Sequence, residues 1–92
     1  MLKMSKGKSW LAKKTKYLSF YGYMSEKRKT PIYQVRPVRN DFEFLGEIRY
    51  YPGWRKFVFM PNSNTQFDDG CLNDIADFIK NDANKYKEVD NE

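Results

Sequence analysis

The chain has 92 residues, a formal net charge of +5, one cysteine and no histidine. This length suits one small domain with a single modest core. Without histidine the chain lacks the commonest general base and metal ligand, and one cysteine excludes an internal disulfide. We therefore expect a protein that is not an enzyme and that holds neither a cofactor nor a metal.

The positive charge is concentrated in the first part of the chain. Residues 1–39 hold eleven Lys or Arg and one acid, Glu26, which gives +10, whereas residues 40–92 sum to −5. A concentrated basic segment attracts polyanions because contact with phosphates releases their counterions. The charge pattern therefore favours nucleic acid as a partner.

Residues 1–16 are rich in lysine, with Trp10 and Leu11 as the apolar anchor. This pattern predicts a basic arm that is disordered or forms a short helix over Ser9–Lys16, which Ser9 can cap. The segment has no apolar run typical of a secretory signal, and no stretch approaches the roughly 20 apolar residues of a membrane span. We expect a cytoplasmic protein.

Four segments are rich in the β-branched and aromatic residues typical of strands. The last two alternate polar and apolar residues around Pro52-Gly53, which predicts a hairpin with one buried face. The segments are Tyr17–Tyr23, Ile32–Val35, Phe42–Tyr50 and Trp54–Met60.

The hairpin register decides which side chains face the core. A two-residue loop at Pro52-Gly53 would place Tyr51 opposite Trp54, although the turn type that Pro-Gly favours suits a longer loop. In the two-residue register, the core face would hold Phe44, Ile48, Tyr50, Arg55, Phe57 and Phe59, and the other face would present Arg49, Tyr51, Trp54 and Lys56 to solvent or a partner.

A helix is predicted near residues 69–83, capped by Asp68 or Asp69 and with apolar positions 72, 75, 76 and 79 at helical spacing. The whole pattern predicts an α+β domain over residues 17–83, followed by a frayed tail at 84–92. We expect an antiparallel sheet of three or four strands with the helix packed on one face. The expected core residues are Phe44, Ile48, Phe57, Phe59, Leu72, Ile75 and Ile79.

Three short motifs follow one another within residues 33–80. They are Leu45-Gly46-Glu47-Ile48-Arg49-Tyr50-Tyr51, then Trp54-Arg55 with Phe59-Met60-Pro61, then Cys71-Leu72-Asn73-Asp74-Ile75. In this order they resemble the signature of a group of small phage and prophage proteins, with Tyr50 where that signature usually has tryptophan. The resemblance implies a phage or mobile-element accessory protein in a bacterial host cell, and it implies no particular activity.

Basic and aromatic residues are interleaved through the first two thirds of the chain. Lysine and arginine contact phosphates, and exposed aromatic rings stack on unpaired bases. The alternative is that the aromatic residues fill the core and the lysines only keep the protein soluble. The candidate nucleic-acid-binding residues are Lys13, Lys14, Lys16, Lys27, Arg28, Lys29, Arg36, Arg39, Arg49, Trp54, Arg55 and Lys56.

A second hypothesis is a phage-encoded inhibitor that binds a host defence protein, as anti-CRISPR proteins do, or a replication protein. Its contacts would be Tyr51 and a row of helical aspartates that mimic phosphates: Asp68, Asp69, Asp74 and Asp77. Carboxylates also suit Mg²⁺ or Ca²⁺, but this spacing matches no calcium loop, and acidic residues favour helix starts in any case.

Two further features suggest other roles. A homodimer would use Tyr51 and Trp54, or an unpaired edge strand at Tyr17–Tyr23. Cys71 lies at the predicted helix start, where the pKa of a thiol can be lowered, but a half-buried structural residue is the simpler interpretation.

Overall fold

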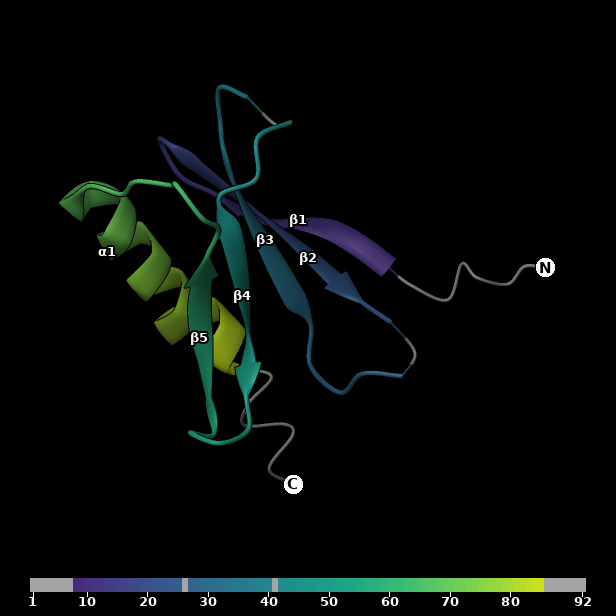
Figure 1. Cartoon of the computed structure of the whole chain (residues 1–92). Coiled ribbons are helices and arrows are strands. Elements are labelled where there is room, and N and C mark those ends of the chain that lie inside the picture. The colour runs from purple at the N-terminus through teal and green to yellow at the C-terminus, as the bar shows by residue number, and fades with distance from the viewer. Residues whose placement is uncertain (1–7, 26, 41, 86–92) are drawn as a thin grey trace.

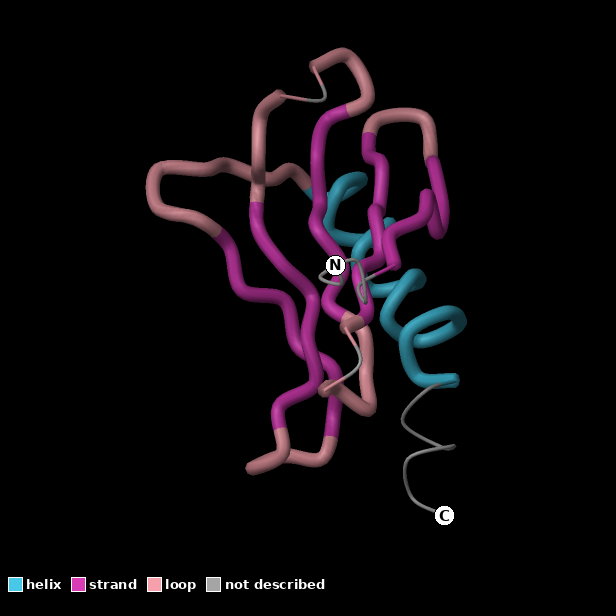
Figure 2. Tube along the Cα trace, turned by 90° about the vertical axis from the view of Figure 1, so that its right-hand side faces the viewer, coloured by secondary structure: helices cyan, strands magenta, loops and turns pink. Residues whose placement is uncertain are grey.

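Five antiparallel strands and one helix make up the part of the chain that the structure, a computed structural model, describes: residues 8–25, 27–40 and 42–85. The strands lie in the sheet in chain order, and the helix packs on one face (Figures 1 and 2). The predicted α+β class is confirmed, with five strands rather than three or four. The strands are β1 (Lys8–Lys14), β2 (Leu18–Met24), β3 (Ile32–Pro37), β4 (Gly46–Tyr51) and β5 (Lys56–Pro61).

The helix begins where the sequence predicts it. Helix α1 (Asp69–Phe78) is capped by Asp68 and continues into a π-helical turn, η2 (Ile79–Ala83). Within the described ranges, no helix has both the length and the apolar character needed to cross a bilayer.

Strand β1 is formed by residues that were expected in a basic arm or short helix. It pairs with β2 and places Trp10 opposite Gly22. Because Gly22 has no side chain, the indole lies directly over it, and a Cβ there would come within 2.6 Å of the ring. The indole edge also meets the ring of Tyr33, with centroids 6.2 Å apart. The arm is therefore not confirmed over residues 8–14, and residues 1–7 lie outside the described part.

The same pairing corrects a second expectation. One of the two possible homodimer seams was an unpaired edge strand at Tyr17–Tyr23, but β2 is hydrogen-bonded to β1 on one side and β3 on the other. The edges are β1 and β5. A register irregularity between Leu11 and Lys13 and a terminal Pro61 interrupt these edges, features that oppose edge pairing with a second copy.

The β4–β5 hairpin has a four-residue turn over residues 52–55, and Tyr51 pairs with Lys56. The two-residue register was therefore wrong by two positions. An even shift leaves every paired side chain on its predicted face, since strand side chains alternate with a period of two. Arg55 is the exception, because it lies in the turn with a φ of 57° and is exposed rather than facing the core.

Aromatic side chains join the helix to the sheet. The rings of Phe20 and Phe78 stack with centroids 4.4 Å apart and an interplanar angle of 10°. Tyr33 meets Phe78 edge-on, with centroids 4.7 Å apart. None of the three side chains is more than 2% exposed. This cluster fixes which face of the sheet the helix covers.

The predicted core is largely right on the sheet and partly wrong on the helix. The side chain of Leu72 is 50% exposed, because α1 contacts the core through Cys71, Ile75 and Phe78. The buried face of the helix is therefore rotated by about one residue from the predicted apolar stripe. Phe44 lies in the loop before β4, where its ring centroid is 5.7 Å from the Arg36 guanidinium. Of the other expected core residues, Ile48, Phe57 and Ile75 are buried, and Phe59 and Ile79 are partly buried.

The contact between Trp10 and Gly22 predicts an unusual response to a strand-forming substitution. We expect Gly22→Val to lower the free energy of unfolding by about 1–3 kcal/mol, because the new side chain overlaps the indole and must displace β1. In a Trp10→Ala background the same substitution should cost nothing, because the space is free and valine favours strands. Urea unfolding followed by far-UV circular dichroism measures both. An equal cost in the two backgrounds would contradict the packing of β1.

Candidate nucleic-acid interface

No helix or strand that the structure describes covers the sheet face opposite α1 (Figures 1 and 2), although Ser19 on this face is only 1% exposed and the Phe44 ring of the β3–β4 loop lies 5.7 Å from the Arg36 guanidinium. We call this sheet face the open face. A continuous row of cross-strand neighbours crosses it from β1 to β5: Leu11, Tyr21, Gln34, Glu47 and Met60. By alternation along the strands, the open face also carries Lys14, Tyr23, Arg36, Arg49, Tyr51, Lys56 and Val58.

Four of the predicted cations lie on the open face. The two arginines are held in place: Arg36 Nη2 donates to Gln34 Oε1 at 2.6 Å, and Arg49 Nη2 pairs with Glu47 Oε1 at 3.3 Å. The Nε–H of Arg49 is buried and has no acceptor among the described residues. The other two cations, Lys14 and Lys56, are exposed on the outer strands β1 and β5. The open face therefore offers both fixed and adaptable positive charge.

Large aromatic rings are exposed on and beside this face. Tyr23 is 44% exposed, Tyr51 41% and Trp54 67%. The rings of Tyr51 and Trp54 meet edge to face, with centroids 5.2 Å apart. Gly53 eases this arrangement, because a Cβ at that position would lie 3.0 Å from the Tyr51 ring, a tight contact. Trp54 belongs to the turn and not to the paired strands, as the longer loop requires.

Another group of predicted cations gathers at one end of the sheet. Antiparallel pairing brings the β2–β3 loop (residues 25–31) and the β4–β5 turn (residues 52–55) to this end, in the lower half of Figure 1. Arg28 closes the loop by donating from Nε to the Thr30 carbonyl at 3.2 Å. The cations at this end, which we call the basic end, are Lys27, Arg28, Lys29 and Arg55.

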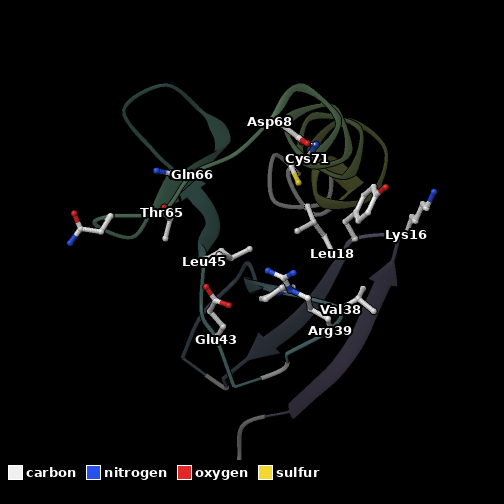
Figure 3. A pocket seen from close by; sticks show the side chains of 13 residues that line it. Lys16, Leu18, Val38, Arg39, Glu43, Leu45, Thr65, Gln66, Asp68 and Cys71 are labelled. Carbon is white, nitrogen blue, oxygen red and sulfur yellow. Dashed lines mark hydrogen bonds between the residues drawn. The ribbon is translucent and has the colours of Figure 1, made fainter.

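The remaining predicted cations are set apart from the open face. Lys16 and Arg39 line a cleft of about 510 Å³ at the opposite end of the sheet. Figure 3 shows Arg39 and Glu43 on one side of this cleft and Asp68 and Cys71, at the start of α1, on the other. Lys13 lies at the irregular position of edge strand β1. Nine of the twelve predicted residues thus lie on the open face or at the basic end, with Lys14 and Arg36 toward the cleft end of that face and the other seven toward the basic end.

The acidic residues of the alternative site lie mainly on the helix side. Asp69 and Asp77 are exposed on α1, and Asp74 is half-buried. Tyr51 lies on the open face, across the sheet from these aspartates, and so does not form one surface with them. Within the described ranges, no three Asp, Glu, Cys or His side chains come together as a metal-binding group.

Asp68 has a structural task. Its Oδ1 accepts a hydrogen bond of 2.8 Å from the backbone N–H of Cys71, which caps the helix. This hydrogen bond to the charged form is the main cause that lowers the pKa of Asp68 from its ordinary value of 3.8. Burial, followed by the hydrogen bond and charge of Asp68, raises the pKa of the Cys71 thiol. The helix start therefore does not activate this thiol.

Several open-face residues are not among the candidate site residues predicted from the sequence: Leu11, Tyr21, Tyr23, Gln34 and Met60. Their position on this face depends on which strands pair, which local pattern does not reveal. One local signal existed, because Tyr21 and Tyr23 alternate with the core positions Phe20 and Gly22 along β2.

Comparisons of the chain with protein-family models, with curated proteins and with solved structures give no significant match. The resemblance to small phage proteins therefore stays a prediction.

The cap at Asp68 predicts a pH-dependent stability difference. Because the folded-state pKa is depressed, the stabilisation is complete above pH 3.8 and is lost as the pH falls through the lower folded value. We expect Asp68→Ala to lower the urea midpoint at neutral pH and to converge on the parent protein in acid. Asp68→Asn, which keeps a capping oxygen, should lose less at neutral pH. A pH-independent gap between Asp68→Ala and the parent would contradict the role of the charged cap.

Proposed function

We propose that this chain is a non-enzymatic nucleic-acid-binding protein that uses the open face and the basic end. The observation that carries this proposal is the separation of charge between the two layers. Residues 8–67, which form the sheet and its loops, hold twelve Lys or Arg and four acids, whereas residues 68–85, which contain α1, hold two Lys and five Asp. A polyanion approaching this molecule is attracted to the sheet side and repelled by the helix side.

The arrangement of side chains suits contact with phosphates. Arg36 and Arg49 are already oriented by neighbours on the sheet, so they lose little conformational freedom on binding. Lys14 and Lys56 are exposed at the outer strands and adjust to the path of a backbone. Phosphate contacts of this kind give affinity without sequence preference.

The biological setting that we propose follows the sequence resemblance. A small accessory protein of a phage or mobile element, acting in the cytoplasm of a bacterial host, meets both its own and the host's nucleic acid. The resemblance supports the setting, and the charge distribution supports the binding.

A matched pair of lysine substitutions tests this proposal. Lys14→Gln and Lys56→Gln should each weaken nucleic-acid binding and reduce the magnitude of the salt slope by about one. Lys85→Gln removes the same charge from the helix side and should change neither. Fluorescence anisotropy with labelled oligonucleotides, from about 50 to about 200 mM salt, measures both quantities. Equal losses for the sheet and helix variants would contradict binding through the open face.

A second candidate function is the inhibition of a host protein by the acidic helix. The observation that favours it is the outward side of α1, where Leu72 is 50% exposed and lies one turn from the exposed Asp69. An apolar side chain among carboxylates suits a basic protein surface better than a nucleic acid. The absence of any nucleic-acid binding at low salt would contradict the first proposal and favour this one.

A further inference from the structure

We infer that the nucleic acid bound by the open face is single-stranded, with unpaired bases stacked on Tyr23, Tyr51 and Trp54. This inference rests on the proposed function and specifies its ligand. Charge alone does not distinguish a duplex from a single strand, since both present phosphates. The exposed rings distinguish the two ligands, because an aromatic ring can stack only on a base whose face is free.

The exposed rings are not required by the core. The core already contains Phe20, Tyr33, Phe57 and Phe78, none more than 4% exposed. In contrast, the rings of Tyr23, Tyr51 and Trp54, which we call the stacking platform, are 41 to 67% exposed and lie on the open face or in the adjoining turn. Tyr17 and Phe42 are also exposed, but they lie singly in loops away from this end of the sheet. Rings that share one surface mark an interaction site, whereas single exposed rings do not.

The shape and charge of the molecule oppose recognition of a duplex. Groove readout inserts a helix, a two-stranded ribbon or a sheet face whose side chains reach the base edges. Helix α1 carries Asp69, Asp74 and Asp77, and it lies on the side of the sheet away from the cations of the open face. Insertion of this helix would bring carboxylates against phosphates. A sheet face laid in a groove would meet base edges, and the exposed rings would find no free base face to stack on, because each base in a duplex is covered by its neighbours.

The platform is prepared for stacking beside phosphate-binding groups. The edge-to-face contact between Tyr51 and Trp54 fixes both rings at the hairpin turn, where Gly53 leaves room for the Tyr51 ring. Lys56 pairs directly opposite Tyr51. Tyr23 lies at the same end of the sheet, one residue before β2 ends and the loop with Lys27, Arg28 and Lys29 follows. Bases on the rings would therefore leave their phosphates next to the basic end.

The middle of the open face adds polar groups within the same surface. Gln34 and Glu47 are direct cross-strand neighbours there, and Gln34 keeps its amide donors for other partners when its oxygen accepts from Arg36. Splayed bases present hydrogen-bonding edges that such groups can contact. A duplex keeps its pairing edges engaged.

The test compares three ligands, each about 12 nucleotides or base pairs long: oligo(dT), oligo(rU) and a DNA duplex of mixed sequence. This length lies within the site sizes of small single-strand-binding domains. We expect one or both single strands to bind tighter than the duplex. Tyr23→Leu, Tyr51→Leu and Trp54→Leu should each weaken single-strand binding roughly tenfold, whereas Tyr23→Phe, Tyr51→Phe and Trp54→Phe keep a ring and should retain most of it. Unchanged urea midpoints show that each variant is folded.

A spectroscopic readout reports stacking directly. In a Trp10→Phe variant, Trp54 is the sole tryptophan, and its emission should be quenched by the single strand and not by the duplex. Equal affinity for duplex and single strand, together with Leu variants that bind like the parent, would overturn this inference but leave the proposed function supported by the lysine variants. Failure of all three ligands to bind at low salt would overturn both.

Discussion

The contact on which the rest of the structure depends is the stacking of Phe78 on Phe20, with Tyr33 against the edge of the Phe78 ring. These side chains come from the helix and from two central strands, and burial of large rings is the main stabilising term available to a domain of this size. The cluster commits the single helix to one face of the sheet. With no second helix among the described residues, the other face is left for solvent or a ligand.

The separation of charge reinforces this division into two sides. The aspartates lie on the helix, and Asp68 stabilises its first turn as the cap. The cations lie mostly on the sheet and its loops, where Glu47 and Gln34 orient Arg49 and Arg36. The open face and the basic end combine this charge with exposed rings. Packing and electrostatics therefore distinguish the same two sides of the molecule, and a polyanion has one favourable direction of approach.

Local signals in the sequence predict the parts of this arrangement that depend on neighbouring residues. Alternation in the β4–β5 hairpin gives the correct faces even though the register is wrong by two, and an acidic cap gives the helix start. Strand β1 is different, because its stability comes from Trp10 over Gly22, a contact between residues twelve positions apart. The helix face is also decided at a distance, since Phe78 reaches Phe20 and turns Leu72 to solvent.

The candidate site, too, is only partly predictable from local sequence. Arg49, Tyr51 and Lys56 are predicted on one face from the hairpin alone, but Tyr21 and Tyr23 join them only through the pairing of β2 with β3. Antiparallel topology also carries Lys16 and Arg39 to the far end, beside the cleft, although they are close in sequence to residues of the open face.

Binding through the open face is tested most directly by a two-dimensional ¹H–¹⁵N NMR titration of the whole chain with a short single-stranded oligonucleotide. We expect shifts concentrated at Tyr23, Arg49, Tyr51, Lys56 and the indole N–H of Trp54, with the amides of Asp69 and Asp77 unchanged. Shifts centred on α1 would contradict the claim that the uncovered sheet face is the binding surface.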